Sequence, residues 1–212
     1  MPNNTSFTRP IVFVVDDDVS VRESLELLFE AAGWRARMFT TAEEFLAHPR
    51  EPVASCLVLD VGLPELNGLE LQQRVAGHPD LPIIFITGRG DIPMSVKAIK
   101  AGAVEFLTKP FAPDILLSAV RNALEHSRAS LAQSAELRTL RDRYESLTTR
   151  EREVMALVVR GHLNKQAAFE LGLSEITIKV HRGRVMRKME AASLADLVGM
   201  AARLAETAAD KH

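Results

Sequence analysis

Short apolar runs alternate with amphipathic stretches along the first half of the chain. Two of the runs, at residues 11–15 and 83–86, are apolar throughout, which is typical of parallel strands that are covered on both faces. We therefore predict an α/β doubly wound fold with a five-stranded parallel sheet. The predicted strands lie at residues 11–15, 35–39, 56–59, 82–87 and 104–107, and the predicted helices at 19–32, 42–47, 66–75, 93–101 and from 113 onward.

The second half predicts helices alone. Residues 114–160 contain neither glycine nor proline, so the last helix of the first half is predicted to continue as a linker, with a break near residues 127–135 as an open alternative. This linker is a solvated spacer or a helix through which two chains dimerise. Beyond it, a short helix, a tight turn at Gly172 and a longer basic helix match the helix-turn-helix unit. The four helices predicted there lie at residues 150–160, 165–171, 175–189 and 194–205.

Capping signals support these boundaries. Thr41 and Glu44 have the spacing of a capping box at a helix start, as do Thr148 and Glu151. Ser174 is placed to cap the basic helix. Together the patterns predict an α/β domain over residues 10–126, a helical linker over 127–146 and an all-α four-helix helix-turn-helix domain over 147–208.

Composition narrows the class of protein. The 212 residues are 47% apolar and 25% charged, which is ordinary for a globular chain of two small domains. No run approaches the roughly 18 apolar residues of a membrane span, and the first residues do not resemble a secretion signal, so we expect a cytoplasmic protein with no membrane partner. The single cysteine, Cys56, is expected to pack in a buried strand, and it excludes an intramolecular disulfide.

The charges are distributed unevenly. Residues 1–126 carry 11 basic and 17 acidic side chains, a net charge of −6, whereas residues 127–212 carry 15 and 11, a net charge of +4. Five basic residues and no acid lie between Lys179 and Lys188. We therefore expect the two halves to bind different partners. The positive charge of the second half suits a polyanion as its partner.

Polar side chains gather where the predicted strands end. Residues 16–18 are three aspartates directly after the first strand, Asp60 follows the third, Thr87 ends the fourth and Lys109 follows the fifth. Because the carboxyl ends of parallel strands meet at one edge, we expect these groups to converge. Clustered carboxylates repel one another unless a hard cation joins them, and Mg²⁺ fits. The pocket predicts phosphoryl chemistry with an aspartate nucleophile, in which Lys109 and the ion neutralise the transferring oxygens and the Thr87 hydroxyl donates to one.

The basic helix predicted at residues 175–189 has two different faces. Arg182, Val185 and Met189 lie within about 40° of Ile178, and Arg182 is the only polar member of this core-facing stripe. The opposite face combines cations with a small apolar patch, which suits the major groove of double-stranded DNA. A face that is merely solvated is the alternative. The candidate DNA-binding residues on this face are Lys179, Val180, Gly183, Arg184 and Arg187.

The chain resembles the two-component response regulators of the NarL/FixJ family, in which a receiver domain precedes a LuxR-type helix-turn-helix domain. The resemblance covers about residues 10–205. The matching stretches are Val15-Asp16-Asp17, residues 59–64, Thr87-Gly88 and 106–111 in the first half, and residues 147–154, Asn164-Lys165 and 177–182 in the second.

The resemblance implies roles for the acidic residues. Asp60 is implied as the phosphoryl acceptor, and Asp16 and Asp17 hold Mg²⁺ together with Asp60. The backbone carbonyl of Gly62 is implied to complete the shell of the ion. Many relatives carry a side chain at this position, so the glycine at Gly62 is a departure from the pattern of the family.

The same resemblance implies a function. Thr87 and Phe106 become the switch pair that responds to the phosphoryl group. Asn164, Lys165 and Thr177 join the candidate DNA-binding residues. We expect a phosphorylation-activated transcription regulator and not an enzyme. The implied partners are a sensor histidine kinase, double-stranded promoter DNA and, on phosphorylation, a second copy of the chain in a homodimer.

Two other classes of protein are alternatives. Asp16, Thr87 and Lys109 also occur in the order of the haloacid-dehalogenase-type phosphatases, which would make Asp16 the nucleophile and leave Asp60 unused. That family needs an acidic pair after the lysine, whereas the chain supplies one acid, Asp114, at a helix start. A regulator gated by a small molecule is disfavoured, because the first half predicts an acidic pocket and not an apolar cavity.

Overall fold

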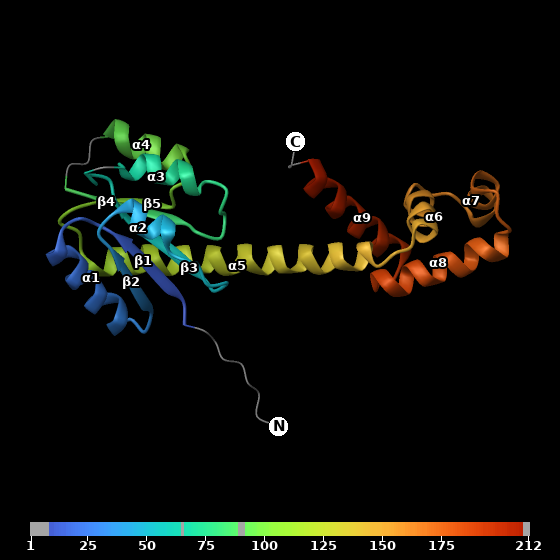
Figure 1. Cartoon of the computed structure of the whole chain (residues 1–212), viewed down its shortest axis with the longest axis horizontal. Helices are drawn as coiled ribbons and strands as arrows, with labels where there is room; N and C mark the ends of the chain where they lie inside the picture. Colours follow the sequence, from blue (N-terminus) through green and yellow to red (C-terminus); the bar gives the residue numbers. More distant parts are fainter. Residues whose placement is uncertain (1–8, 65, 89–91, 210–212) are drawn as a thin grey trace, which may run out of the picture. The chain divides into compact units, whose positions relative to one another are not determined.

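The structure is a computed structural model of the chain and describes residues 9–64, 66–88 and 92–209 (Figure 1). The chain divides into two compact units, Met1–Ala132 and Gln133–His212. The first unit packs two hydrophobic clusters, and the second unit packs a third. Over the described ranges, no helix is long and apolar enough to span a bilayer.

A five-stranded parallel sheet forms the centre of the first unit, with the strand order β2-β1-β3-β4-β5. The predicted fold class is therefore confirmed. Val15 at the end of β1 pairs with Leu59 of β3, so the residues that follow them, Asp16 and Asp60, are neighbours at the carboxyl edge. The strands are β1 Ile11–Val15, β2 Arg35–Phe39, β3 Ser55–Asp60, β4 Ile83–Thr87 and β5 Glu105–Thr108.

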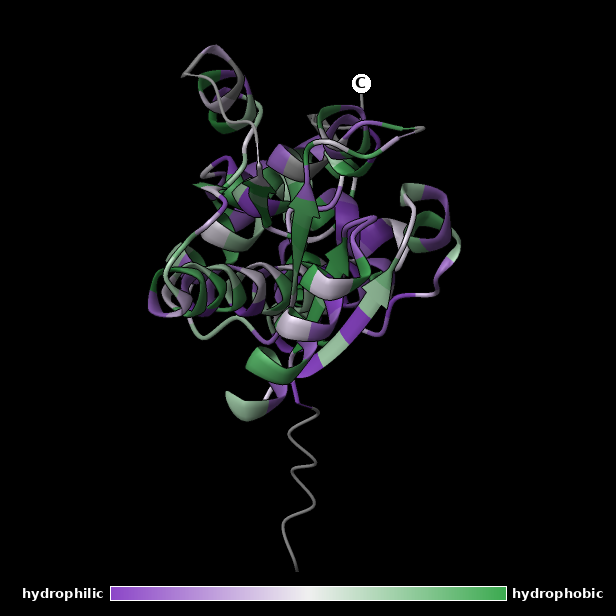
Figure 2. Cartoon of the chain, turned by 90° about the vertical axis from the view of Figure 1, so that its left-hand side faces the viewer, coloured by the Kyte–Doolittle hydropathy of each residue, from purple (hydrophilic) through white to green (hydrophobic). Residues whose placement is uncertain are grey.

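Helices cover both faces of the sheet (Figure 1). α1 and the first part of α5 pack on the face that carries Val12 and Val14. α2, α3 and α4 pack on the other face, against Phe13 and its neighbours. Figure 2 shows the central strands as mainly hydrophobic, as expected for a doubly covered sheet, and Cys56 is fully buried there as predicted. The helices are α1 Val19–Ala31, α2 Ala42–Ala47, α3 Gly68–Val75, α4 Ile92–Lys100 and α5 Pro113–Glu145.

The start of α3 differs from the prediction by two residues. Asn67 caps the helix, because its side chain accepts a hydrogen bond from the N–H of Glu70, and α3 therefore begins at Gly68. A Cβ at Gly68 would lie 2.6 Å from the backbone oxygen of Asp60. The missing side chain lets the start of α3 lie against the end of β3, which fixes the backbone at Asp60.

α5 is one continuous helix of 33 residues, without a break near residues 127–135. A polar contact with the sheet region comes from the fully buried Ser127, one residue beyond the predicted end of the first domain. The Ser127 hydroxyl donates to the carbonyl of Asp80 over 2.6 Å and accepts from the N–H of Ser55 over 3.0 Å. Ser127 thereby holds α5 at the amino edge of β3.

The second unit contains the predicted helix-turn-helix arrangement. Thr148 and Glu151 form the capping box of α6, Ser174 caps α8, and Gly172 ends α7 with a φ of 64°, a left-handed conformation that favours glycine. Ile178 of α8 packs in the core of the unit. The helices are α6 Thr149–Val159, α7 Asn164–Leu171, α8 Glu175–Met189 and α9 Leu194–Ala209, the last of which ends four residues beyond the predicted position.

Candidate functional site

Three of the predicted polar residues meet at the carboxyl edge of the sheet. Asp16 follows β1, Asp60 is the last residue of β3, and Lys109 follows β5. The Nζ of Lys109 lies 2.6 Å from Oδ2 of Asp16 and 3.1 Å from Oδ1 of Asp60. One ammonium group therefore bridges two carboxylates that come from separate strands.

Backbone groups fix the orientation of both carboxylates. Oδ1 of Asp16 accepts from the N–H of Asp18 over 3.0 Å, and Oδ2 of Asp60 accepts from the N–H of Gly62 over 2.7 Å. The guanidinium of Arg22, in α1, donates to the carbonyl of Asp16 over 2.6 Å. Sequence reasoning missed Arg22, because a cation six residues from an aspartate carries no recognisable motif.

Burial and charge act against each other at this site. Burial raises the pKa of Asp16, the hydrogen bond from Lys109 opposes this shift, and the nearby charge of Asp60 adds to it. Burial also lowers the pKa of Lys109, but its hydrogen bonds to Asp16 and Asp60 outweigh that effect, so the pKa is raised overall. Lys109 therefore stays protonated, and the two carboxylates when ionised exceed its charge.

The remaining aspartates of the loop lie further out. Asp17 is exposed, and Asp18 caps α1 by accepting from the N–H of Ser20 over 2.8 Å. Among the residues that the structure describes, no three acidic, imidazole or thiol side chains form a ready metal cluster. Mg²⁺ does not require one, since it binds through one or two carboxylates together with water and phosphate oxygens. The donors present fit such an ion.

The two predicted switch residues lie on neighbouring strands at different depths. Thr87 ends β4, is buried, and accepts with its backbone carbonyl from the N–H of Lys109 over 2.7 Å. Phe106 lies two residues before the end of β5, pairs with Phe85 in the register, and its ring centroid is 6.2 Å from that of Phe85. Thr87 therefore adjoins the acidic site, whereas Phe106 lies further along the sheet.

α8 presents the two faces that the sequence predicts. Ile178, Val185 and Met189 are buried in the core of the second unit. The opposite face is open to solvent, and α7 adds the exposed Lys165. The exposed residues of α8 on that face are Lys179, Val180, Gly183, Arg184 and Arg187.

Two other candidates, Thr177 and Asn164, and one further cation of α8, Lys188, are engaged within the unit. The hydroxyl of Thr177 lies 2.8 Å from that of Ser174, and the side-chain oxygen of Asn164 accepts from Arg182. Lys188, which belongs to the basic run of the sequence, forms an ion pair with the buried Glu151. Lys188 therefore joins α8 to α6 through this ion pair, and we do not assign it to the exposed basic face.

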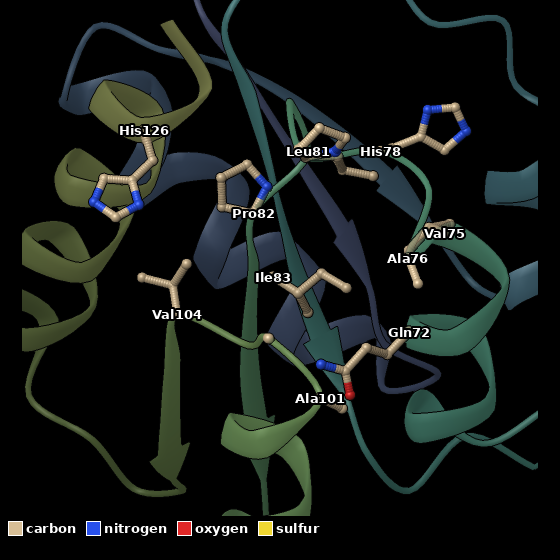
Figure 3. Close-up of a pocket in the computed structure, with 12 residues that line it drawn as sticks. Gln72, Val75, Ala76, His78, Leu81, Pro82, Ile83, Ala101, Val104 and His126 are labelled. Atoms are coloured by element: carbon tan, nitrogen blue, oxygen red, sulfur yellow. The ribbon is translucent and has the colours of Figure 1, made fainter. Parts of the chain in front are cut away.

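A separate cavity of about 220 Å³ lies at the amino ends of β4 and β5 (Figure 3). Gln72 of α3 and His126 of α5 line it from either side. Gln72 donates to the carbonyl of Ala98 in α4 over 3.0 Å. No carboxylate of the described chain lines this cavity, which opens at the edge of the sheet opposite to the acidic site.

Comparisons with known proteins agree with this geometry. The family model of the response regulator receiver domain matches residues 12–121, and that of bacterial regulatory proteins of the luxR family matches residues 145–201. Nodulation protein W of Bradyrhizobium diazoefficiens is 50% identical over 198 residues, which are 93% of this chain and 87% of that protein. The transcriptional regulatory protein FixJ of Rhizobium meliloti is 41% identical over 90% of this chain and 94% of its own length.

A solved structure of a response regulator is also similar to this chain over nearly its whole length. The response regulator StyR superposes with a TM-score of 0.82 at 45% identity, over 92% of this chain and 100% of that one. The chain belongs to the response regulators of the NarL/FixJ family. It is a phosphorylation-dependent, DNA-binding transcription regulator of a two-component system, and its receiver domain implies a histidine kinase as partner.

Proposed function

We propose that Asp60 is the residue of this regulator that accepts the phosphoryl group. The bridge from Lys109 to Asp60 and Asp16 supports this assignment, because an ammonium group beside a carboxylate nucleophile stabilises the charge on transferring oxygens. The side chain of Asp60 is 10% exposed and that of Asp16 is 1% exposed. Asp60 is therefore the more accessible of the two carboxylates to a phosphodonor.

The proposed transfer uses groups that already lie at the carboxyl edge. A carboxylate oxygen of Asp60 bonds to phosphorus while the bond from phosphorus to the imidazole nitrogen of the kinase phosphohistidine breaks. The imidazole leaves, and an acyl phosphate remains on Asp60. Lys109 pairs with one phosphoryl oxygen, and the Thr87 hydroxyl donates to another.

We expect Asp16, Asp17 and Asp60 to hold Mg²⁺ together with the carbonyl oxygen of Gly62. When bound, the ion supplies positive charge to the transferring phosphoryl oxygens. Lys109 alone does not balance three carboxylates, so a divalent cation relieves the repulsion that remains.

Phosphorylation is proposed to act on DNA binding through dimerisation. A hydrogen bond from Thr87 to the phosphoryl group shifts Phe106, α4 and β5, and the altered surface joins two chains. We assign residues 10–126 to the phosphoacceptor domain, 127–146 to the linker and 147–208 to the domain that binds double-stranded promoter DNA in the cytoplasm. The proposed DNA-binding residues are Asn164, Lys165, Thr177, Lys179, Val180, Gly183, Arg184 and Arg187.

The test uses acetyl phosphate or beryllofluoride with Mg²⁺ and measures the intact mass of the full chain. We expect one modification, which Asp60→Asn removes and Asp17→Asn weakens through the ion. Asp80→Asn, a carboxyl at the opposite edge of the sheet, serves as the control and should be modified normally. Modification that persists in Asp60→Asn would exclude Asp60 as the acceptor.

A further inference from the structure

Arg182 lies on α8 between the buried face of the helix and its exposed basic face. Its Nη1 donates to Oδ1 of Asn164 at the start of α7 over 3.2 Å. Both side chains are half-buried. The bond therefore ties the first residue of α7 to the middle of α8, and it sets where the guanidinium group lies.

This hydrogen bond leaves the charge of Arg182 uncompensated. The amide of Asn164 is neutral, and across the described residues no ion pair includes Arg182. Lys188 on the same helix is paired with Glu151. A guanidinium is always charged and has five N–H donors in a planar fork, so one bond to a neutral amide leaves most of the fork available to an anion. Arg182 therefore retains both donors and charge for an anion from outside the chain.

The surroundings of Arg182 indicate which anion this is. Lys165 follows Asn164 on α7, Lys179 lies one turn before Arg182 on α8, and both lysines are exposed. These cations adjoin the face proposed to enter the major groove. We propose that Arg182 binds a phosphate of the DNA backbone, and that Asn164 is a positioning residue that holds the guanidinium for this contact. The inference rests on the proposed DNA-binding surface.

A phosphate contact has a measurable consequence that a purely structural bond lacks. Each neutralised phosphate releases counterions, so affinity decreases as salt concentration rises. When one contact is lost, the magnitude of the negative slope of log affinity against log salt concentration decreases by about 0.9. If one contact is lost, the ratio of wild-type to variant affinity is therefore about 3- to 4-fold larger at about 50 mM salt than at about 200 mM salt. Backbone contacts carry no sequence information, so a short duplex of random sequence is a suitable probe.

The experiment measures binding of the full chain to that duplex by fluorescence anisotropy across this salt range. We expect Arg182→Ala to reduce the slope by about 0.9 and Arg182→Lys to keep most of it. Asn164→Asp is the sharper variant, because the new carboxylate pairs with Arg182 and neutralises it while keeping the shape of the side chain. We expect Asn164→Asp to weaken binding and reduce the slope by about 0.9 without lowering the melting temperature.

Two matched variants separate this contact from general electrostatics. Gln166→Glu makes the same charge change two residues further along α7, and Arg203→Ala removes a cation of α9 that is paired with Glu136. Both should change the slope less than Asn164→Asp does. A wild-type slope in both Asn164→Asp and Arg182→Ala would overturn the inference while leaving the DNA-binding surface in place. Affinity of the wild-type chain that is independent of salt would overturn the surface and the inference together.

Discussion

Lys188 and Glu151 join the end of α8 to the start of α6, with 2.7 Å between Nζ and Oε2. The same ammonium donates to the carbonyl of Ser146 over 2.9 Å, and the same carboxylate accepts from the N–H of Thr148 over 2.9 Å. α8 is therefore anchored at its carboxyl end by a buried acid. The exposed face of the helix carries the proposed DNA-binding residues Lys179, Arg184 and Arg187.

We expect Lys188→Met to lower the free energy of unfolding of the second unit by about 1–3 kcal/mol, because the substitution leaves the buried carboxylate of Glu151 without its cation. Hydrogen exchange of the α6 and α8 amides measures this locally. Arg187→Met is the control, since Arg187 is exposed on the same helix. Equal exchange in the two variants would contradict the anchoring role.

The anchor also makes the second unit sensitive to acid. The hydrogen bond from Lys188, followed by that from the Thr148 backbone, holds the pKa of Glu151 below its ordinary value of 4.5. A carboxyl with a lowered pKa stabilises the fold above its unfolded pKa, and this stabilisation is lost as the pH falls through the folded value. Protection of α6 should therefore decline below about pH 4.5 in the wild type and decline less in Lys188→Met.

Ser127→Ala should lower the free energy of unfolding of the first unit by about 1–3 kcal/mol, because the buried N–H of Ser55 and carbonyl of Asp80 lose their partner. Urea unfolding followed by the fluorescence of Trp34, the single tryptophan, reports on this unit. Ser118→Ala, on the exposed side of the same helix, should change little. Similar midpoints for both variants would refute the role of Ser127.

Thr87→Ala should accept a phosphoryl group at Asp60 yet remain monomeric, because the hydroxyl is proposed to transmit the modification and not to carry it. Intact mass measures the modification, and sedimentation velocity measures the dimer. Thr108→Ala, the pairing partner of Thr87 on β5, is the control and should dimerise normally. A Thr87→Ala protein that dimerises on phosphorylation would separate this residue from the switch.

Lys179→Ala and Arg184→Ala should each weaken promoter binding by about 1–3 kcal/mol where the side chain reads a base edge, and both should leave phosphorylation and dimerisation intact. Two half-sites about one helical turn apart should bind more tightly than one, since dimerisation makes the second contact intramolecular. Gel shifts with one or two half-sites, using phosphorylated wild type and Asp60→Asn, measure this. Equal affinity in all four combinations would exclude the mechanism.

The sheet and its acidic edge follow from local sequence patterns. The uninterrupted apolar runs predict β1 with its observed bounds and β4 with a start one residue too early, since both faces of each strand are covered. Asp16, Asp60 and Lys109 could be placed together because parallel strands bring their carboxyl ends to one edge. Gly172 and Ser174 predicted the turn before α8 for a similarly local reason.

The features that sequence reasoning missed depend on contacts between distant residues. Lys188 looks identical to its basic neighbours until the fold places Glu151 beside it. Ser127 has no motif, because its partners Ser55 and Asp80 are far away in the chain. The predicted linker ends one residue beyond α5, but a break near residues 127–135 stayed open, since helical spacing alone does not reveal whether a polar stretch interrupts a helix.

The continuity of α5 has a practical consequence for anyone who divides this protein. Leu140, near the carboxyl end of α5, packs in the same core as Leu147 and Val154. A DNA-binding fragment that began at residue 147 would lack Leu140 and leave apolar surface uncovered, and a receiver fragment that stopped at residue 126 would lack Ser127. Fragments of the two domains should therefore end or begin inside α5, between residues 128 and 139, and not at either end of the predicted linker.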